Sequence, residues 1–247
     1  MAVEHYLKIG FIMKIIVALL FMTSLSSSAS ECEISPDVLS AYYQLSTQSS
    51  DTTAIKKTVQ QLFELHREAK VALHRNISKG VDELWTKNGH RLSLSRVFEK
   101  YQHAIEYQSN ELRYQPLWQD VFQLVVTPEL KNMQLVEQKN TGCLLEEHYI
   151  LKDKHKEYQL IWLPKLRLVK YFQLKDVKFT RQWQLTKYQP NGEEMLSLFK
   201  QYSTYQSTDY ADIGDSEDVP FLATMINQGF SVPVYHHTGP ANNEHRH

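Results

Sequence analysis

The sequence predicts an α+β protein, in which helices precede and follow a central antiparallel β-meander. Apolar residues recur at helical spacing between Asp51 and Lys79, whereas compact apolar and aromatic runs, separated by short polar breaks, fill the stretch from Leu144 to Tyr188. The breaks are too short for crossover helices, so neighbouring strands are expected to pair antiparallel. The long helix is expected to lie across one face of this sheet.

The N-terminus is typical of a secretory signal peptide. Lys14 is followed by the apolar run Ile15 to Met22 and then by small polar residues. A basic residue, a short apolar run and a small-residue exit are the parts of such a signal, and the run is shorter than the about 20 residues that cross a membrane. Cleavage fits after Ala29 or Ser30, and translation can start at Met13. An uncleaved N-terminal anchor is the alternative.

Two helices are expected after the signal. Ser35 and Pro36 are typical of a helix start, and a short apolar face follows from Val38 to Leu45. The long helix is expected from Asp51 to Lys79, with Gly80 as its C-terminal cap. Its apolar stripe advances in steps of four and three residues through Ile55, Val59, Leu62, His66, Ala69, Leu73 and Ile77. Its polar face carries Lys56, Lys57, Gln60, Gln61, Glu64 and Arg67.

The elements of the second half follow from apolar runs and turn residues. Residues 92–107 fit both a helix and a strand, and a helix is slightly favoured. Four strands are expected over 144–151, 158–163, 166–174 and 179–188. Pro190-Asn191-Gly192 is a turn, after which Glu193 begins a helix, and a last short helix is expected from Asp218 to Gly229.

Composition and motifs exclude several classes of function. The formal net charge of the chain is −1, so it lacks the basic field that nucleic-acid binding normally requires. It has no glycine-rich phosphate loop, dinucleotide fingerprint, Gly-x-Ser-x-Gly elbow, His-Glu-x-x-His helix or Cys-x-x-Cys pair. A non-enzymatic protein without an organic cofactor is therefore expected, and a hydrolase with catalytic residues dispersed along the chain is the alternative.

The two cysteines, Cys32 and Cys143, are expected to form one disulfide, because an exported protein folds in an oxidising compartment. The bridge would close a loop of more than about 100 residues, for which the chain-entropy contribution is about 4–5 kcal/mol. Two unpaired thiols are the alternative.

Four histidines gather near the C-terminus: His236, His237, His245 and His247. Imidazole is a common ligand of zinc, copper and nickel, and a flexible histidine-rich end can bind such ions without a folded site. These residues support a second functional hypothesis, that of a metal-binding or metal-handling protein. A polar tail that binds no metal is the alternative.

Trp162 and Trp183 lie in neighbouring expected strands, where they can line a cavity for an apolar ligand or a surface for a peptide. Packing in the sheet core is the alternative for both. His66 lies on the apolar stripe of the expected long helix, so it can bind a ligand or a metal under the sheet. A core histidine that is hydrogen-bonded to a neighbour is the more ordinary interpretation.

The run Tyr158-Gln159-Leu160-Ile161-Trp162-Leu163-Pro164, with the order of the expected strands, resembles the lipoprotein-carrier and sigma-regulator fold of bacterial periplasms. This resemblance covers about half the chain and implies a curved antiparallel sheet crossed by helices. The segments Asp209 to Asp215, Pro220-Phe221 and Met225 to Phe230 look like a C-terminal signature of uncharacterised gammaproteobacterial exported proteins. Neither resemblance implies the role of any residue.

The chain is therefore expected to divide into a signal peptide (1–30), one α+β domain (31–235) and a flexible histidine-rich tail (236–247). After signal cleavage it is expected to be periplasmic or secreted, without a membrane span. The leading hypothesis is a non-enzymatic binding or interaction protein. Its partner, a protein, a peptide or an apolar ligand, would bind an aromatic-lined sheet face under the long helix.

Overall fold

The structure, a computed structural model, describes residues 33–49, 58–112, 116–190, 192–215 and 220–222. The chain divides into two compact units, Met1–Glu33 and Ile34–His247, and Glu33 is the described residue of the first unit. All strands and helices given below belong to the second unit.

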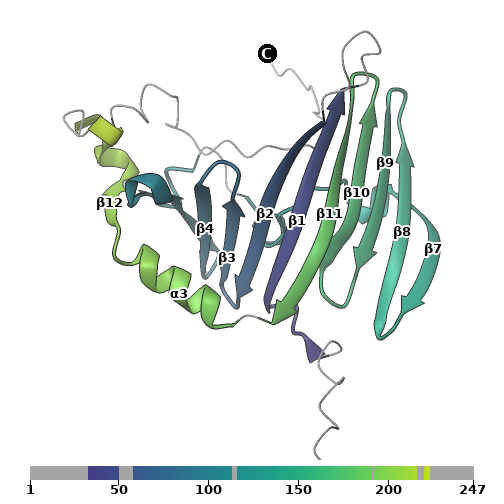
Figure 1. Cartoon of the computed structure of the whole chain (residues 1–247), viewed down its shortest axis with the longest axis horizontal. Coiled ribbons are helices and arrows are strands. Elements are labelled where there is room, and N and C mark those ends of the chain that lie inside the picture. The colour runs from purple at the N-terminus through teal and green to yellow at the C-terminus, as the bar shows by residue number, and fades with distance from the viewer. Residues whose placement is uncertain (1–32, 50–57, 113–115, 191, 216–219, 223–247) are drawn as a thin grey trace, which may run out of the picture. The chain divides into compact units, whose positions relative to one another are not determined.

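The described residues form one sheet of twelve strands in the order β12-β6-β5-β4-β3-β2-β1-β11-β10-β9-β8-β7 (Figure 1). The first six strands are β1 Val38–Ser49, β2 Thr58–Glu68, β3 Val71–Asn76, β4 Val81–Asn88, β5 Arg91–Phe98 and β6 His103–Tyr107. The others are β7 Gln134–Thr141, β8 Leu144–Lys152, β9 Lys156–Leu163, β10 Leu168–Asp176, β11 Phe179–Pro190 and β12 Gln206–Asp209. Neighbouring strands are antiparallel, except that β12 runs parallel to β6.

The described helices are short. They are the α-helices α2 Trp118–Val121 and α3 Glu193–Tyr202 and the 3₁₀ turns η2 Glu99–Tyr101, η3 Leu130–Asn132 and η4 Tyr210–Asp215. In the described part of the chain, none is long and apolar enough to cross a membrane. The predicted α+β layout with a long helix is therefore wrong, because the protein is mostly one large sheet.

The expected long helix is an antiparallel pair of strands, β2 and β3. Its supposed apolar stripe does not share one environment, since Leu62 and Ile77 are exposed while His66 and Leu73 are buried. Buried residues instead alternate along the strand, with Leu65 and Arg67 on the face opposite His66. Both faces of β2 are covered near its end, since the consecutive residues Leu65, His66 and Arg67 are all buried.

The residues of the turn between β2 and β3 explain why the sequence did not predict this hairpin. Glu68 pairs with Val71, so the connection consists of Ala69 and Lys70. Ala69 has a φ of 49°, a left-handed conformation that such turns usually assign to glycine or asparagine. Because alanine and lysine are strong helix formers, the residues at this turn indicated a continuing helix.

Two other expectations near the N-terminus also change. The helix expected from Ser35 is β1, in which Leu39, Ala41 and Tyr43 alternate toward the core. Residues 92–107 are the strands β5 and β6 joined by η2, so the slightly favoured helix is wrong.

The later elements were predicted more accurately. Strands β8 to β11 lie where the sequence placed four strands, and they pair antiparallel in chain order. The helix that begins at Glu193 is α3. The last expected helix, Asp218 to Gly229, lies largely outside the described residues.

The sheet has two chemically distinct faces. Successive residues of a strand point to opposite sides, and antiparallel partners share a side. We call the side that carries Leu45 and its partner Trp183 the apolar face, and the side that carries Gln44 and its partner Gln184 the polar face. Two core clusters lie on the apolar face, one over β1, β2 and β8–β11 and one over β3–β6. The segment 117–133 packs on both.

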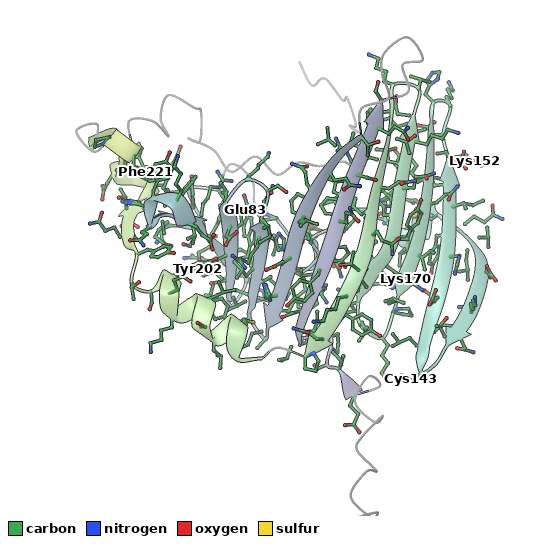
Figure 2. The ribbon with its side chains drawn as sticks, in the orientation of Figure 1. Glu83, Cys143, Lys152, Lys170, Tyr202 and Phe221 are labelled. Atoms are coloured by element: carbon green, nitrogen blue, oxygen red, sulfur yellow. The ribbon has the colours of Figure 1, made fainter. Side chains whose placement is uncertain are left out.

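A third, smaller cluster lies on the polar face, where α3 covers β3 to β6. Leu198, Phe199 and Tyr202 of the helix pack there against Leu73 and Val97 of the sheet. Figure 2 shows Tyr202 on the side of α3 that faces the strands. The rest of the polar face, over β1 and β8–β11, carries mostly polar side chains such as Gln173.

Candidate ligand-binding face

The structure places Trp162 and Trp183 on the apolar face, on β9 and β11. Trp183 is opposite Phe172 of β10, which is opposite Leu160 of β9, two residues before Trp162. The ring of Trp183 lies 4.8 Å from that of Phe63 and 6.3 Å from that of Tyr43, measured between centroids. The two tryptophans therefore belong to one surface, but β10 lies between their strands, so the expectation that these strands are neighbours is wrong.

Half-buried side chains surround the fully buried core on this face. We call six of them the apolar wall: Phe63, Tyr149, Leu151, Trp162, Phe179 and Trp183. They pack on buried residues such as Tyr158 and Phe172, which are each 1% exposed. The wall thus has a rigid base and retains apolar surface that water can reach.

Arg67 holds the covering segment against one end of the apolar face. It is fully buried, and its guanidinium donates to the backbone carbonyls of Phe122 (2.7 Å), Pro36 (3.2 Å), Leu166 (3.1 Å) and Arg167 (2.8 Å). The same group stacks on the ring of Phe122 at 3.9 Å. Burial, with a smaller contribution from the nearby Arg167, lowers the pKa of Arg67 to about 9 against the opposing effects of Tyr43 and Asp37.

His66 lies on the opposite face from the two tryptophans. Its Nδ1 is 2.8 Å from the Ser40 hydroxyl, and its Nε2 is 3.1 Å from a carboxylate oxygen of Glu64. Because the carboxylate can only accept, Nε2 donates to Glu64 and Nδ1 accepts from Ser40. His66 is 1% exposed, and the Tyr42 ring packs edge-on against it. It is a buried histidine bonded to its neighbours, and it does not join Trp162 and Trp183 in one site.

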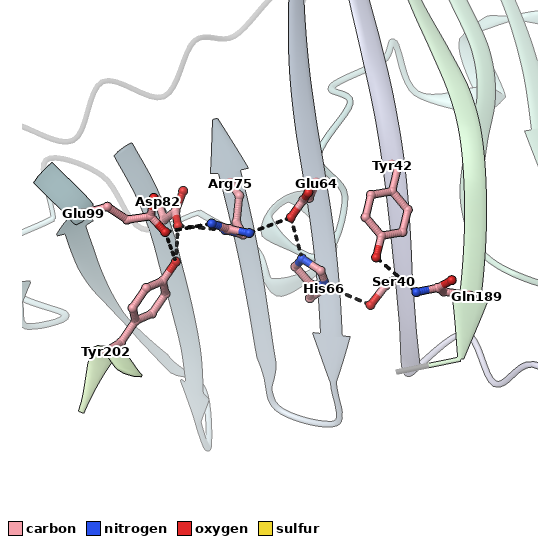
Figure 3. Close-up of polar contacts among 9 residues, drawn as sticks. All are labelled: Ser40, Tyr42, Glu64, His66, Arg75, Asp82, Glu99, Gln189 and Tyr202. Carbon is pink, nitrogen blue, oxygen red and sulfur yellow. Dashed lines mark hydrogen bonds and ion pairs between the residues drawn. The ribbon is translucent and has the colours of Figure 1, made fainter. Parts of the chain in front are cut away.

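A line of charged groups continues from His66 toward α3 (Figure 3). Arg75 donates to Glu64 at 2.8 Å, to Asp82 at 2.9 Å and to Glu99 at 2.8 Å. The hydroxyl of Tyr202 donates to Asp82. Burial would raise the pKa of Glu64, but the His66 hydrogen bond and the Arg75 charge outweigh it and hold the pKa below its usual range. These bonds attach α3 to the polar face.

His74 provides a titratable contact under the covering segment. Its Nε2 donates to the carbonyl of Val121 at 2.7 Å. Burial lowers the pKa of His74 from 6.5 to about 4, although Glu83 and the Val121 carbonyl oppose the shift. His74 therefore binds a proton less readily in the folded protein than in the unfolded chain. The stability that depends on neutral His74 is fully present above about pH 6.5 and is lost as the pH falls toward 4.

We expect the free energy of unfolding to fall by about 3 kcal/mol between pH 6.5 and 4 through His74 alone. In His74→Gln, which removes the titration but keeps an N–H donor, urea unfolding should show a correspondingly flatter pH dependence. His90→Gln is the matched control, because His90 is exposed. A His74→Gln protein with the same slope as wild type would contradict the assignment.

The remaining predicted sites lie partly outside the described residues. Cys143 follows Gly142 in the turn between β7 and β8 (Figure 2), whereas Cys32 is not among the described residues, so the disulfide stays a prediction. The tail histidines His236, His237, His245 and His247 also lie outside them. Within the described ranges, no cluster of metal-binding side chains occurs.

Sequence reasoning missed Arg67 and Arg181 as residues of the apolar face. Arg67 was placed on the solvent side of a helix, and Arg181 was not singled out. The alternation Phe179, Arg181, Trp183, Leu185 along β11 carries the signal for Arg181, since a charged residue stands at a core-facing position. Arg67 was missed because its segment was predicted as a helix, and strand alternation was therefore not applied to it.

Comparisons with known proteins give only distant similarity. No protein-family model matches the chain, and no curated protein matches its sequence. Similar solved structures include an uncharacterized conserved protein from Thermus thermophilus (TM-score 0.39, 7% identity, 68% of this chain and 90% of that one). A DUF1329 family protein from Desulfovibrio piger is similar with a TM-score of 0.33 and 7% identity, over 65% of this chain and 88% of that one. A LolA superfamily protein from Nitrosomonas europaea is similar with a TM-score of 0.31 and 10% identity, over 65% of this chain and 90% of that one. At these TM-scores they establish neither fold nor function.

Proposed function

We propose that this chain is a non-enzymatic binding protein that, after export, holds an apolar ligand on the apolar wall. The observation that carries the proposal is the grouping of half-buried aromatic side chains, with Trp183 at 4.8 Å from Phe63, on a face whose base is fully buried. Covering apolar surface contributes about 25 cal/mol per Å², and aromatic rings offer much of it at low entropic cost.

The wall suits an apolar chain better than a polar one. The backbone groups of the strands beneath the wall form hydrogen bonds with neighbouring strands of the sheet, from β2 through β1 and β11 to β8. A ligand on the wall therefore meets side chains, and most of these are aromatic or aliphatic. An extended hydrocarbon chain can lie over Trp162, Trp183 and Phe63 without leaving unpaired polar groups.

The proposal is tested with the methyl ester of a mid-chain brominated fatty acid, because bromine quenches tryptophan fluorescence on near contact. The ester should quench wild-type fluorescence in a saturable way. In the double variant Trp162→Phe/Trp183→Phe, most of that quenching should be lost. Two tryptophans remain there, Trp85 and Trp118, which pack in the cluster over β3–β6.

Trp118→Phe is the matched control for the quenching experiment, since Trp118 lies in α2 away from the wall. It should keep the wild-type response. Circular dichroism of each variant shows whether the sheet is intact. Equal quenching in the double variant and in the control, or no saturable quenching of the wild type, would rule out a ligand on the wall.

Ser40, His66 and Glu64 combine the residue types of a hydrolase catalytic triad, which consists of a serine, a histidine and a carboxylate. Here Ser40 is 3% exposed and His66 is 1% exposed, so a substrate cannot reach the hydroxyl. Glu64 is also bound to Arg75. The arrangement is explained as a buried polar link between β1 and β2, and the proposed function assigns it no catalysis.

A further inference from the structure

Arg181 is a positive side chain set within the apolar wall. On β11 it stands between Phe179 and Trp183, each two residues away on the same face. Its cross-strand partners are Thr47 of β1 and Leu174 of β10, neither of which carries a charge. Arg181 therefore places a positive charge between two aromatic side chains of this surface.

The guanidinium of Arg181 has a hydrogen-bond donor without an acceptor. Its Nε atom is buried, and no hydrogen-bond partner for it occurs in the described part of the chain. The guanidinium also contacts the ring of Phe179, whose centroid lies 5.4 Å from Cζ. A buried donor that lacks a partner costs about 1–3 kcal/mol, and an anion that reaches it recovers that cost.

Other charged groups of this face have their own partners. Arg67 is held by backbone carbonyls, and Glu147 accepts from the Tyr149 hydroxyl at 2.8 Å. At the strand ends Asp176 and Lys156 stand opposite each other in the register of β10 and β9. These two charges balance in sign, whereas among the described residues no carboxylate forms an ion pair with Arg181.

We propose that the ligand of the apolar wall is a long-chain carboxylate, with its hydrocarbon chain over Trp183 and Phe63 and its head group at Arg181. The inference rests on the proposed function and adds the chemistry of the head group. One guanidinium matches one carboxylate in charge and in its planar, two-pronged geometry. A phosphate monoester would bring a second negative charge that no further cation in the wall balances.

The test compares three brominated probes with the same chain at pH 8: the fatty acid, its methyl ester and the corresponding amine. Wild-type protein should bind the acid about 10-fold or more tighter than the ester, and the amine most weakly, because only the acid carries a negative charge that pairs with the guanidinium. Arg181→Gln should lose this preference, because its affinity for the acid should fall to about that for the ester. Arg181→Glu should prefer the amine.

Arg91→Gln is the matched control, since Arg91 is exposed on β5. It should bind all three probes as wild type does. Arg181→Lys keeps a point charge and should keep part of the preference for the acid, and the wild-type comparison needs no variant at all. Saturable binding of the ester without a preference for the acid would overturn the inference and leave the proposed function intact. Absence of saturable binding of both the acid and the ester would overturn both.

Discussion

Replacing Arg67 with methionine is expected to lower the free energy of unfolding by about 3–5 kcal/mol. Methionine fills a similar volume and removes the cost of burying a charge. When both partners of a buried ion pair are replaced by apolar residues, the free energy of unfolding can for this reason stay the same. Besides the side-chain oxygen of Gln123, the acceptors of Arg67 are the backbone carbonyls of Pro36, Phe122, Leu166 and Arg167. They stay in place after the substitution and lose their donor.

Urea denaturation of Arg67→Met measures this effect through the shift of its midpoint. Arg91→Met is the matched control, because the same change at an exposed position should alter stability by no more than about 0.5 kcal/mol. Arg67→Lys should be nearly as destabilised as Arg67→Met, since one ammonium cannot replace the fork of a guanidinium. Midpoints that do not change in either variant would mean that Arg67 does not hold the segment.

Reduction of the predicted Cys32–Cys143 disulfide is the second large effect. In the chain-entropy model, loss of a bridge over more than about 100 residues costs about 4–5 kcal/mol, which corresponds to a fall in Tm of about 10 °C or more for a domain of this size. The measurement is thermal unfolding with and without dithiothreitol. Cys143 lies in an exposed turn, so the reductant can reach it.

The control for reduction is the double variant Cys32→Ser/Cys143→Ser, which should unfold at the Tm of the reduced wild type and should not respond to dithiothreitol. Thiol titration of the unreduced, denatured protein provides an independent result. Two reactive thiols per chain in that titration would exclude the bridge.

How far the sequence predicted this protein depends on which residues carried the signal. The strands β8 to β11 were found because short polar breaks separate runs rich in aromatic and β-branched residues. The hairpin of β2 and β3 was missed because its turn, Ala69-Lys70, contains no glycine, asparagine or proline. Local propensity favoured a helix there, and pairing with β1 overrode it.

The residues of the candidate site were likewise predicted only in part. The sequence placed Trp162 and Trp183 in strands of one sheet, and the register with β10 shows that they share a face. His66 could not be separated from them, because the face on which a residue lies depends on whether its segment is a helix or a strand. Arg67 shows the larger error, since a residue placed in solvent is 0% exposed.

By itself the sequence determined the antiparallel strands from 144 to 188 and the helix at Glu193, because each follows from spacing within one segment. Only the tertiary structure decided that the first half is also sheet, that Arg67 is buried and that Arg181 stands within the apolar wall. These features depend on pairing between β1 and β11, which are far apart in the chain. Contacts of that range outweigh local propensity, and no single segment records them.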